Sequence, residues 1–172
     1  MEQSIQEALE AYRQGDLSGA VSSLQYAEQL IQQEKAKRLA AALPEPLPGW
    51  QAERAEGQSA PAAVLGGGVG AKRRYRRGEA EVRIEILSDS PVLQSVLMML
   101  SNPLFATADG GRLVRVGRLK GVLRYDPEER SGSLQLVVAH RFLVNVEGEA
   151  VDRDTLLAYA KAIDLQALAR LP

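Results

Sequence analysis

A change in hydrophobic period at a proline-rich segment constrains the fold of this chain more than any other feature. Before Pro44 the apolar residues recur at helical spacing, whereas after Trp50 they alternate with a period of two. The segment between them cannot continue a helix, because each proline removes a backbone donor and extends the residue before it. We therefore predict a helical region at 1–43, a proline-rich linker at 44–49 and a sheet region at 50–172.

The first region predicts a helical hairpin. Apolar residues fall at helical spacing from Ser4 to Leu43, and Gly15-Asp16 interrupts them. Gly15 can end the first helix in the left-handed conformation, while Asp16 or Ser18 can accept the free amides of the second. We expect two antiparallel helices joined at this dipeptide.

Within this hairpin, Ala8-x3-Tyr12-x2-Gly15-Asp16-x3-Ala20-x3-Leu24-x2-Ala27 resembles a single tetratricopeptide helix pair. In that motif small residues let the helices approach and an aromatic residue wedges between them. A solenoid needs about three such units to bury a continuous core, and this chain has one. We expect the hairpin to pack or dimerise, and peptide binding is the alternative.

The region after the linker predicts a mostly antiparallel sheet covered by helices, which makes the chain an α+β protein. Trp50 is expected to plug one end of the core, and 57–70 is expected to be a mobile Gly/Ala loop. Two helices are expected at 91–101 and 152–171, the second broken at Asp164. The predicted strands, all with a period of two, are 71–77, 80–87, 112–116, 122–125, 133–139 and 142–147.

Pro48-Gly49-Trp50, the hairpin bracketing Gly78 and the strand pair before 152–171 together resemble a PsbP-like α/β/α sandwich. The stretch from Pro48 to Leu171 also resembles small exported bacterial proteins of unassigned activity. This resemblance implies a periplasmic or exported location and action through partners. Met1–Leu9 shows no signal-peptide pattern, so such a location requires a leader beyond this chain, and a cytoplasmic location is the alternative.

A dense cationic run, Lys72-Arg73-Arg74-Tyr75-Arg76-Arg77, is the sharpest local feature. On a strand its side chains alternate between two faces, so we expect either a charged edge strand or a platform for phosphate, nucleic acid or lipid headgroups. Glu79, Glu81 and Glu85 on the following strand are expected to pair with it. A second basic set would strengthen the anion-binding hypothesis if it lay beside this strand: Arg112, Arg115, Arg118, Lys120 and Arg124.

The residues that usually carry catalysis are scarce. The chain has no cysteine, which excludes disulfides, thiolate metal sites and cysteine nucleophiles, and it has one histidine, His140. The glycines before Lys72 lack the spacing and flanking elements of a nucleotide-binding loop. We therefore expect a non-enzyme without a cofactor or metal, and a hydrolase using an unrecognised carboxylate site is the remaining enzymatic alternative.

The favoured function is protein–protein binding or assembly, in the cell envelope or as a homodimer through the hairpin. The helix at 91–101 is apolar on nearly every side, and the residues after it extend that surface. Net charge is −1, and no apolar run is long enough to cross a membrane. The candidate partner-binding residues are Tyr12, Tyr26, Met98, Leu104 and Phe105.

Overall fold

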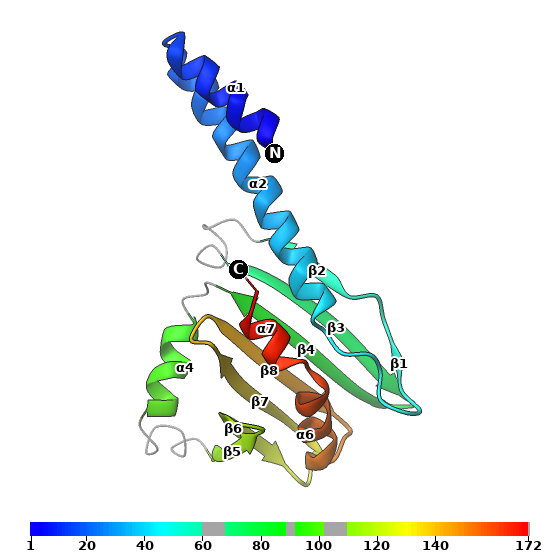
Figure 1. Cartoon of the computed structure of the whole chain (residues 1–172). Helices are drawn as coiled ribbons and strands as arrows, with labels where there is room; N and C mark the ends of the chain where they lie inside the picture. Colours follow the sequence, from blue (N-terminus) through cyan, green and yellow to red (C-terminus); the bar gives the residue numbers. More distant parts are fainter. Residues whose placement is uncertain (60–67, 89–91, 102–109, 172) are drawn as a thin grey trace.

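The computed structural model describes residues 1–59, 68–88, 92–101 and 110–171. It confirms an α+β fold in which an N-terminal helical pair precedes an eight-stranded antiparallel sheet with further helices. Figure 1 shows the pair as a rod that projects away from the sheet. Leu104 and Phe105 lie outside the described residues.

The rod consists of α1 (Glu2–Arg13) and α2 (Leu17–Ala41). The predicted turn is confirmed: Gly15 has a φ of +80°, and the Asp16 carboxylate accepts a 2.9 Å hydrogen bond from the Gly19 amide. At about 1.5 Å per residue, α2 is roughly twice as long as α1. Helix α1 therefore covers only the first half of α2, and the second half reaches the sheet at β2 and β3 (Figure 1).

The sheet has the order β1-β3-β4-β8-β7-β6-β5, and β2 pairs with β3 beside β1. All neighbouring strands pair antiparallel. The predicted strand positions are confirmed, with ends that differ by up to three residues. The strands are β1 (Gln51–Ala52), β2 (Glu56–Ser59), β3 (Val69–Arg77), β4 (Ala80–Ser88), β5 (Arg112–Val116), β6 (Leu119–Asp126), β7 (Ser131–Val138) and β8 (Phe142–Glu149).

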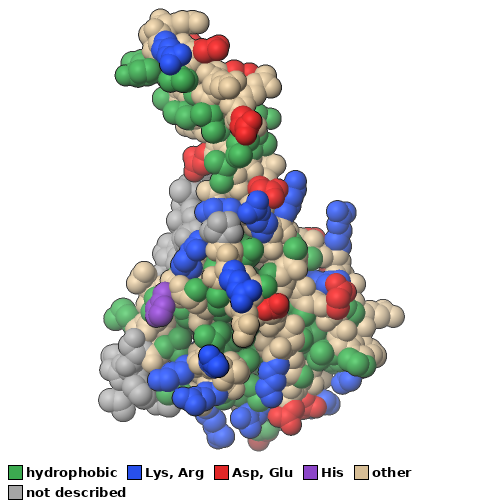
Figure 2. Space-filling model, viewed as in Figure 1, with side chains coloured by type: hydrophobic (Ala, Val, Ile, Leu, Met, Phe, Trp, Pro, Cys, Tyr) green, Lys and Arg blue, Asp and Glu red, His purple; other side chains and the backbone are tan. Residues whose placement is uncertain are grey.

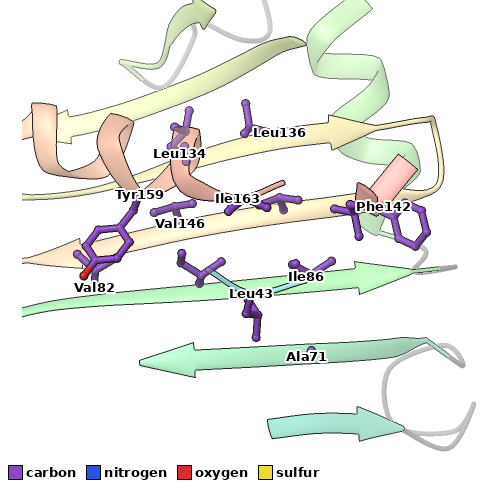
Figure 3. Close-up of a cluster of buried hydrophobic side chains, with 14 of the residues drawn as sticks. Leu43, Ala71, Val82, Ile86, Leu134, Leu136, Phe142, Val146, Tyr159 and Ile163 are labelled. Carbon is purple, nitrogen blue, oxygen red and sulfur yellow. The ribbon is translucent and has the colours of Figure 1, made fainter. Parts of the chain in front are cut away.

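The main core lies between one face of the sheet and the helical segments that cover it. Figure 3 shows side chains of the central strands with Leu43, Tyr159 and Ile163 among them. Helix α6 (Arg153–Ala162) and helix α7 (Leu165–Ala169) cover this face together with the end of α2. The predicted break is confirmed, because Asp164 caps α7 by accepting from the Ala167 amide at 2.8 Å.

The opposite face of the sheet is covered at one end by α4 (Val92–Ser101). Leu93 and Val96 of this helix pack on Val137 and Leu143, which point away from the main core. Elsewhere this second face carries mostly charged and polar side chains at the alternate positions of β3, β4 and β8. We call this uncovered part the open face.

The ends of the loop expected at 57–70 are corrected, because Gly57 lies in β2 and Gly70 in β3, and its residues 60–67 lie outside the described residues. The proline-rich segment packs on the sheet through Pro44, which is buried and whose carbonyl accepts a 2.8 Å hydrogen bond from the Tyr75 hydroxyl. A Cβ on Gly57 would approach the Ala36 backbone to 2.8 Å, so glycine here allows α2 to pack closely on β2.

Trp50 occupies the predicted place in the core. Its side chain is buried and meets Tyr159 edge to face, with ring centroids 5.3 Å apart. The Tyr159 ring also lies 4.7 Å from that of Tyr75. Burial raises the pKa of Tyr159 to about 12, so its hydroxyl stays protonated at neutral pH.

Candidate protein-binding surface

The hairpin packs on itself through small residues and leaves its large apolar residues in solvent. Ser4 and Ala8 of α1 are buried, as are Ala20 and Ala27 of α2. The alanines among them belong to neither core cluster of the sheet domain, so their burial comes from the contact between α1 and α2. Small side chains let the two helices approach closely, whereas Tyr12, the aromatic residue of the tetratricopeptide-like pattern, is 65% exposed and does not wedge between them.

Nine large apolar side chains of the hairpin are between 40% and 65% exposed, and seven of them, all except Met1 and Tyr26, form one set. Six of them directly follow a buried or half-buried residue of the helix–helix contact, and the seventh, Leu17, lies one turn before Ala20. Figure 2 shows hydrophobic side chains along the length of the projecting hairpin. We call this set the apolar face: Ile5, Leu9, Tyr12, Leu17, Val21, Leu24 and Ile31.

Both helices turn these side chains to the same side of the hairpin. Each step along an α-helix rotates a side chain by about 100° in a fixed sense. Seen from one end, antiparallel helices rotate in opposite senses, so residues that follow the contact positions in α1 and α2 converge on one side. The seven residues therefore form one continuous surface across both helices.

The other side of the hairpin is polar. It carries Gln3, Glu7, Gln14, Ser22 and Gln33, all exposed. Tyr26 also lies on this side, because it precedes Ala27, whereas Tyr12 follows Ala11 on the apolar face. The two tyrosines predicted to bind a partner together thus point to opposite sides, although both are more than half exposed.

The remaining predicted partner contact, Met98, is 68% exposed on α4, at a distance in the sequence and the fold from the hairpin. The structure therefore does not combine the described candidates, Tyr12, Tyr26 and Met98, into one surface. The sequence places Ile5, Leu9, Val21 and Leu24 at helical spacing, but it does not show which of them pack between the helices. The sequence pattern that indicates the apolar face is a pair of adjacent stripes on each helix, one of small and one of large apolar residues.

The cationic run lies in β3, which is not an edge strand. It pairs with β4 on one side and with β1 and β2 on the other. Tyr75 is fully buried, so it offers no surface on which a base could stack. Burial raises the pKa of Tyr75 against the opposing effect of Arg73, and its protonated hydroxyl donates to the Pro44 carbonyl.

The charged members of the run are paired within the chain to different degrees. Arg73 donates to the Pro44 carbonyl at 2.9 Å and pairs with Glu45 at 3.2 Å. Arg74 and Arg76 both bind the Glu81 carboxylate at 3.0 Å, as the prediction of cross-strand pairing expected. Lys72 lies 3.5 Å from Glu56, and the Arg77 guanidinium lies 4.8 Å from the Trp50 ring centroid.

The second basic set does not lie beside this strand. Arg112 and Arg115 belong to β5 and Lys120 and Arg124 to β6, at the opposite end of the strand order from β3. His140 lies exposed in the turn between β7 and β8 with a φ of +54°. In the part of the chain that the structure describes, no cluster of His, Asp and Glu has the arrangement of a metal site.

Comparisons with known proteins found no matching family model, no matching curated protein and no matching solved structure. Among the described residues, no helix combines the length and the apolar character needed to cross a membrane.

Proposed function

We propose that this chain is an assembly module that associates with a second copy of itself through the apolar face of its hairpin. The observation that carries the proposal is the exposure of seven large apolar side chains on one side of a projecting pair of helices. Exposed apolar patches of this extent mark interaction surfaces in soluble proteins.

The area of the face fits a dimer interface. The exposed fractions of the seven residues are equivalent to between three and four fully exposed side chains. At roughly 150–200 Å² each, they present on the order of 600 Å² of surface. A standard interface removes about 800 Å² from each partner, and nearly two thirds of its core is apolar.

The spacing on both helices supports a second copy as the occupant. Ile5, Leu9 and Tyr12 are separated by four and three residues, and Leu17, Val21 and Leu24 repeat that spacing. Such spacing forms the seam of a helix bundle, and two hairpins stacked face to face would complete a four-helix bundle. A two-fold pair buries the same face of both copies and leaves the polar side of each in solvent.

The stability of α1 also favours a covered face. Its 12 residues are near the length at which an isolated helix is marginal in water. Its contact with α2 buries Ser4 and Ala8, and burying one methyl group contributes only about 0.8 kcal/mol. Covering Ile5, Leu9 and Tyr12 would supply the apolar burial that the hairpin lacks.

Sedimentation velocity of the full chain over a range of concentrations tests this proposal. We expect a species of twice the 18.7 kDa chain mass, which Leu9→Glu and Leu24→Glu convert to the monomer. Tyr26→Glu is the matched control, because Tyr26 is 57% exposed on the opposite side, and we expect that variant to stay dimeric.

Glu28 provides a gain-of-association variant. It follows Ala27 in the row between Leu24 and Ile31, so Glu28→Leu should extend the apolar face and tighten the dimer. A monomeric wild-type chain at every concentration would refute self-association. Equal disruption by Tyr26→Glu and Leu24→Glu would show that the dimer uses another surface.

A further inference from the structure

A pair of arginines on the open face breaks an otherwise complementary pattern of charges. In the register of β3 and β4, Lys72 lies opposite Glu85 and Arg76 lies opposite Glu81. Between these pairs, Arg74 lies directly opposite Arg83. Like charges in directly opposed positions of a sheet are destabilising, so this pair needs a compensating negative charge.

The nearby carboxylates form ion pairs with Arg74 and not with Arg83 among the described residues. Glu81 binds both Arg74 and Arg76 at 3.0 Å. Glu147, opposite Arg83 on β8, accepts a 2.8 Å hydrogen bond from the Asn145 amide group. Arg83 itself forms no hydrogen bond or ion pair with another residue in the described ranges.

Glu85, the next residue of β4 on the open face, lies near Arg83 without forming an ion pair with it among the described residues. Burial raises the pKa of Glu85, the neighbouring Glu147 raises it further, and attraction to Lys72 and Arg83 opposes this shift. The Arg83 side chain is exposed, and its guanidinium retains donors for an external anion.

Arg83 lines a hollow of about 220 Å³ between β4 and the segment that joins β1 to β2. At roughly 30 Å³ per water molecule, the hollow has room for about seven waters or one tetrahedral oxyanion with part of its hydration shell. Two carboxylates, Glu53 and Glu56, face five cationic side chains there. The cations are Arg54, Lys72, Arg73, Arg74 and Arg83.

We propose that this hollow binds a phosphate-class oxyanion between Arg83 and Arg74. Guanidinium groups bind phosphate oxygens through paired N–H donors, and Lys72 and Arg54 add positive charge at the rim. The bound anion would compensate the opposed arginines of β3 and β4. The site is separate from the apolar face, so the test of anion binding does not depend on whether the chain self-associates.

Thermal unfolding in inorganic phosphate and in chloride at equal ionic strength tests the site. We expect phosphate to raise the Tm of the wild-type chain by a few degrees at concentrations above its Kd. Arg83→Gln should remove this rise, because it deletes the guanidinium that would bind the anion. Arg153→Gln, an exposed arginine of α6, is the control and should retain the response to phosphate.

A second arm distinguishes a free anion from a phosphoryl group on a lipid. Co-sedimentation with phosphatidylglycerol vesicles that depends on Arg83, without a response to inorganic phosphate, would assign the oxyanion to a headgroup. A response to inorganic phosphate without vesicle binding would assign it to a free anion. The proposal is overturned if neither probe gives an effect that Arg83→Gln removes.

Discussion

The hairpin and the sheet domain distribute their side chains in opposite ways. The sheet buries large residues such as Ile84, Leu156 and Tyr159 and turns its charges to solvent. The hairpin buries Ala8, Ala20 and Ala27 and exposes large apolar residues such as Leu9, Leu17 and Leu24. The sheet domain thus buries its large apolar residues within one chain, whereas the described part of the hairpin leaves an apolar surface exposed.

The two regions are joined without a flexible linker. The last turns of α2 contribute Ala36 and Leu39 to the main core, and the chain then continues through the buried Pro44. An apolar face mounted on a helix that is fixed at its base is held away from the sheet. Under the proposed self-association, this arrangement would present the face to the second copy at low entropic cost, because few residues must be ordered on binding.

The largest expected effect is the loss of stability when a buried side chain of the sheet core is shortened. Ile84→Ala removes a fully buried side chain and should lower the free energy of unfolding by about 3 kcal/mol. Leu24→Ala removes a side chain that is 53% exposed and should change the free energy of unfolding of the monomer by less than about 0.5 kcal/mol. Urea denaturation at low protein concentration measures both, and similar losses from the two variants would contradict the contrast between the regions.

A smaller effect is expected in the contact between the hairpin helices. Ala27→Leu places a large side chain where α1 and α2 approach closely, and overpacking should cost about 2 kcal/mol, confined to the hairpin. Amide hydrogen exchange should show faster exchange in α1 with little change in the strands. Ser22→Leu adds similar bulk at an exposed position and should leave the exchange of α1 unchanged.

The smallest effect concerns a helix cap of the sheet domain. Asp152 accepts a 2.7 Å hydrogen bond from the Thr155 amide, and hydrogen bonding by Thr155 lowers the pKa of this carboxyl. Asp152→Ala should therefore cost about 1 kcal/mol at pH 7. Asp152→Asn keeps a capping oxygen and should cost less.

The pH dependence of this cap has a definite sign. Because the folded-state pKa lies below the unfolded value, the contribution of Asp152 is present above the ordinary carboxyl pKa of about 4. It is lost as the pH falls through the lower folded-state value. Denaturation between pH 7 and pH 2 should show a smaller acid-induced loss for Asp152→Ala than for the wild-type chain, and an equal loss would contradict the assigned cause.

Local signals explain which parts of the fold could be predicted. Gly15-Asp16 and Asp164 act through a left-handed φ or a capping carboxylate, so their effect depends on adjacent residues alone. Strands β3 and β4 were recognisable because their side chains alternate between core and solvent. Strands β1 and β2 carry no such alternation, since β1 has two residues and β2 includes Gly57.

The candidate site was less predictable than the fold. Helical spacing identifies which residues share a stripe, but it does not say which of two adjacent stripes packs inward. The sequence left open whether Leu9 and Leu24 pack inside the hairpin, and the close contact of alanines excludes them from the interior. For the cationic run, the sequence predicted Glu81 as a partner but not Glu45, Glu53 or Glu56, which reach β3 from the linker, from the segment between β1 and β2, and from β2.

The sequence by itself determined the class of fold, because its signals are local. The hydrophobic period changes from helical to alternating at the prolines, and Gly15, Asp16 and Asp164 end or cap helices. Only the tertiary structure decided that large apolar residues of the hairpin face solvent and that Arg74 and Arg83 lie opposite each other. Both features depend on which residues that are distant in sequence become neighbours in space. Close packing between helices decides this for the hairpin, and strand register decides it for the two arginines.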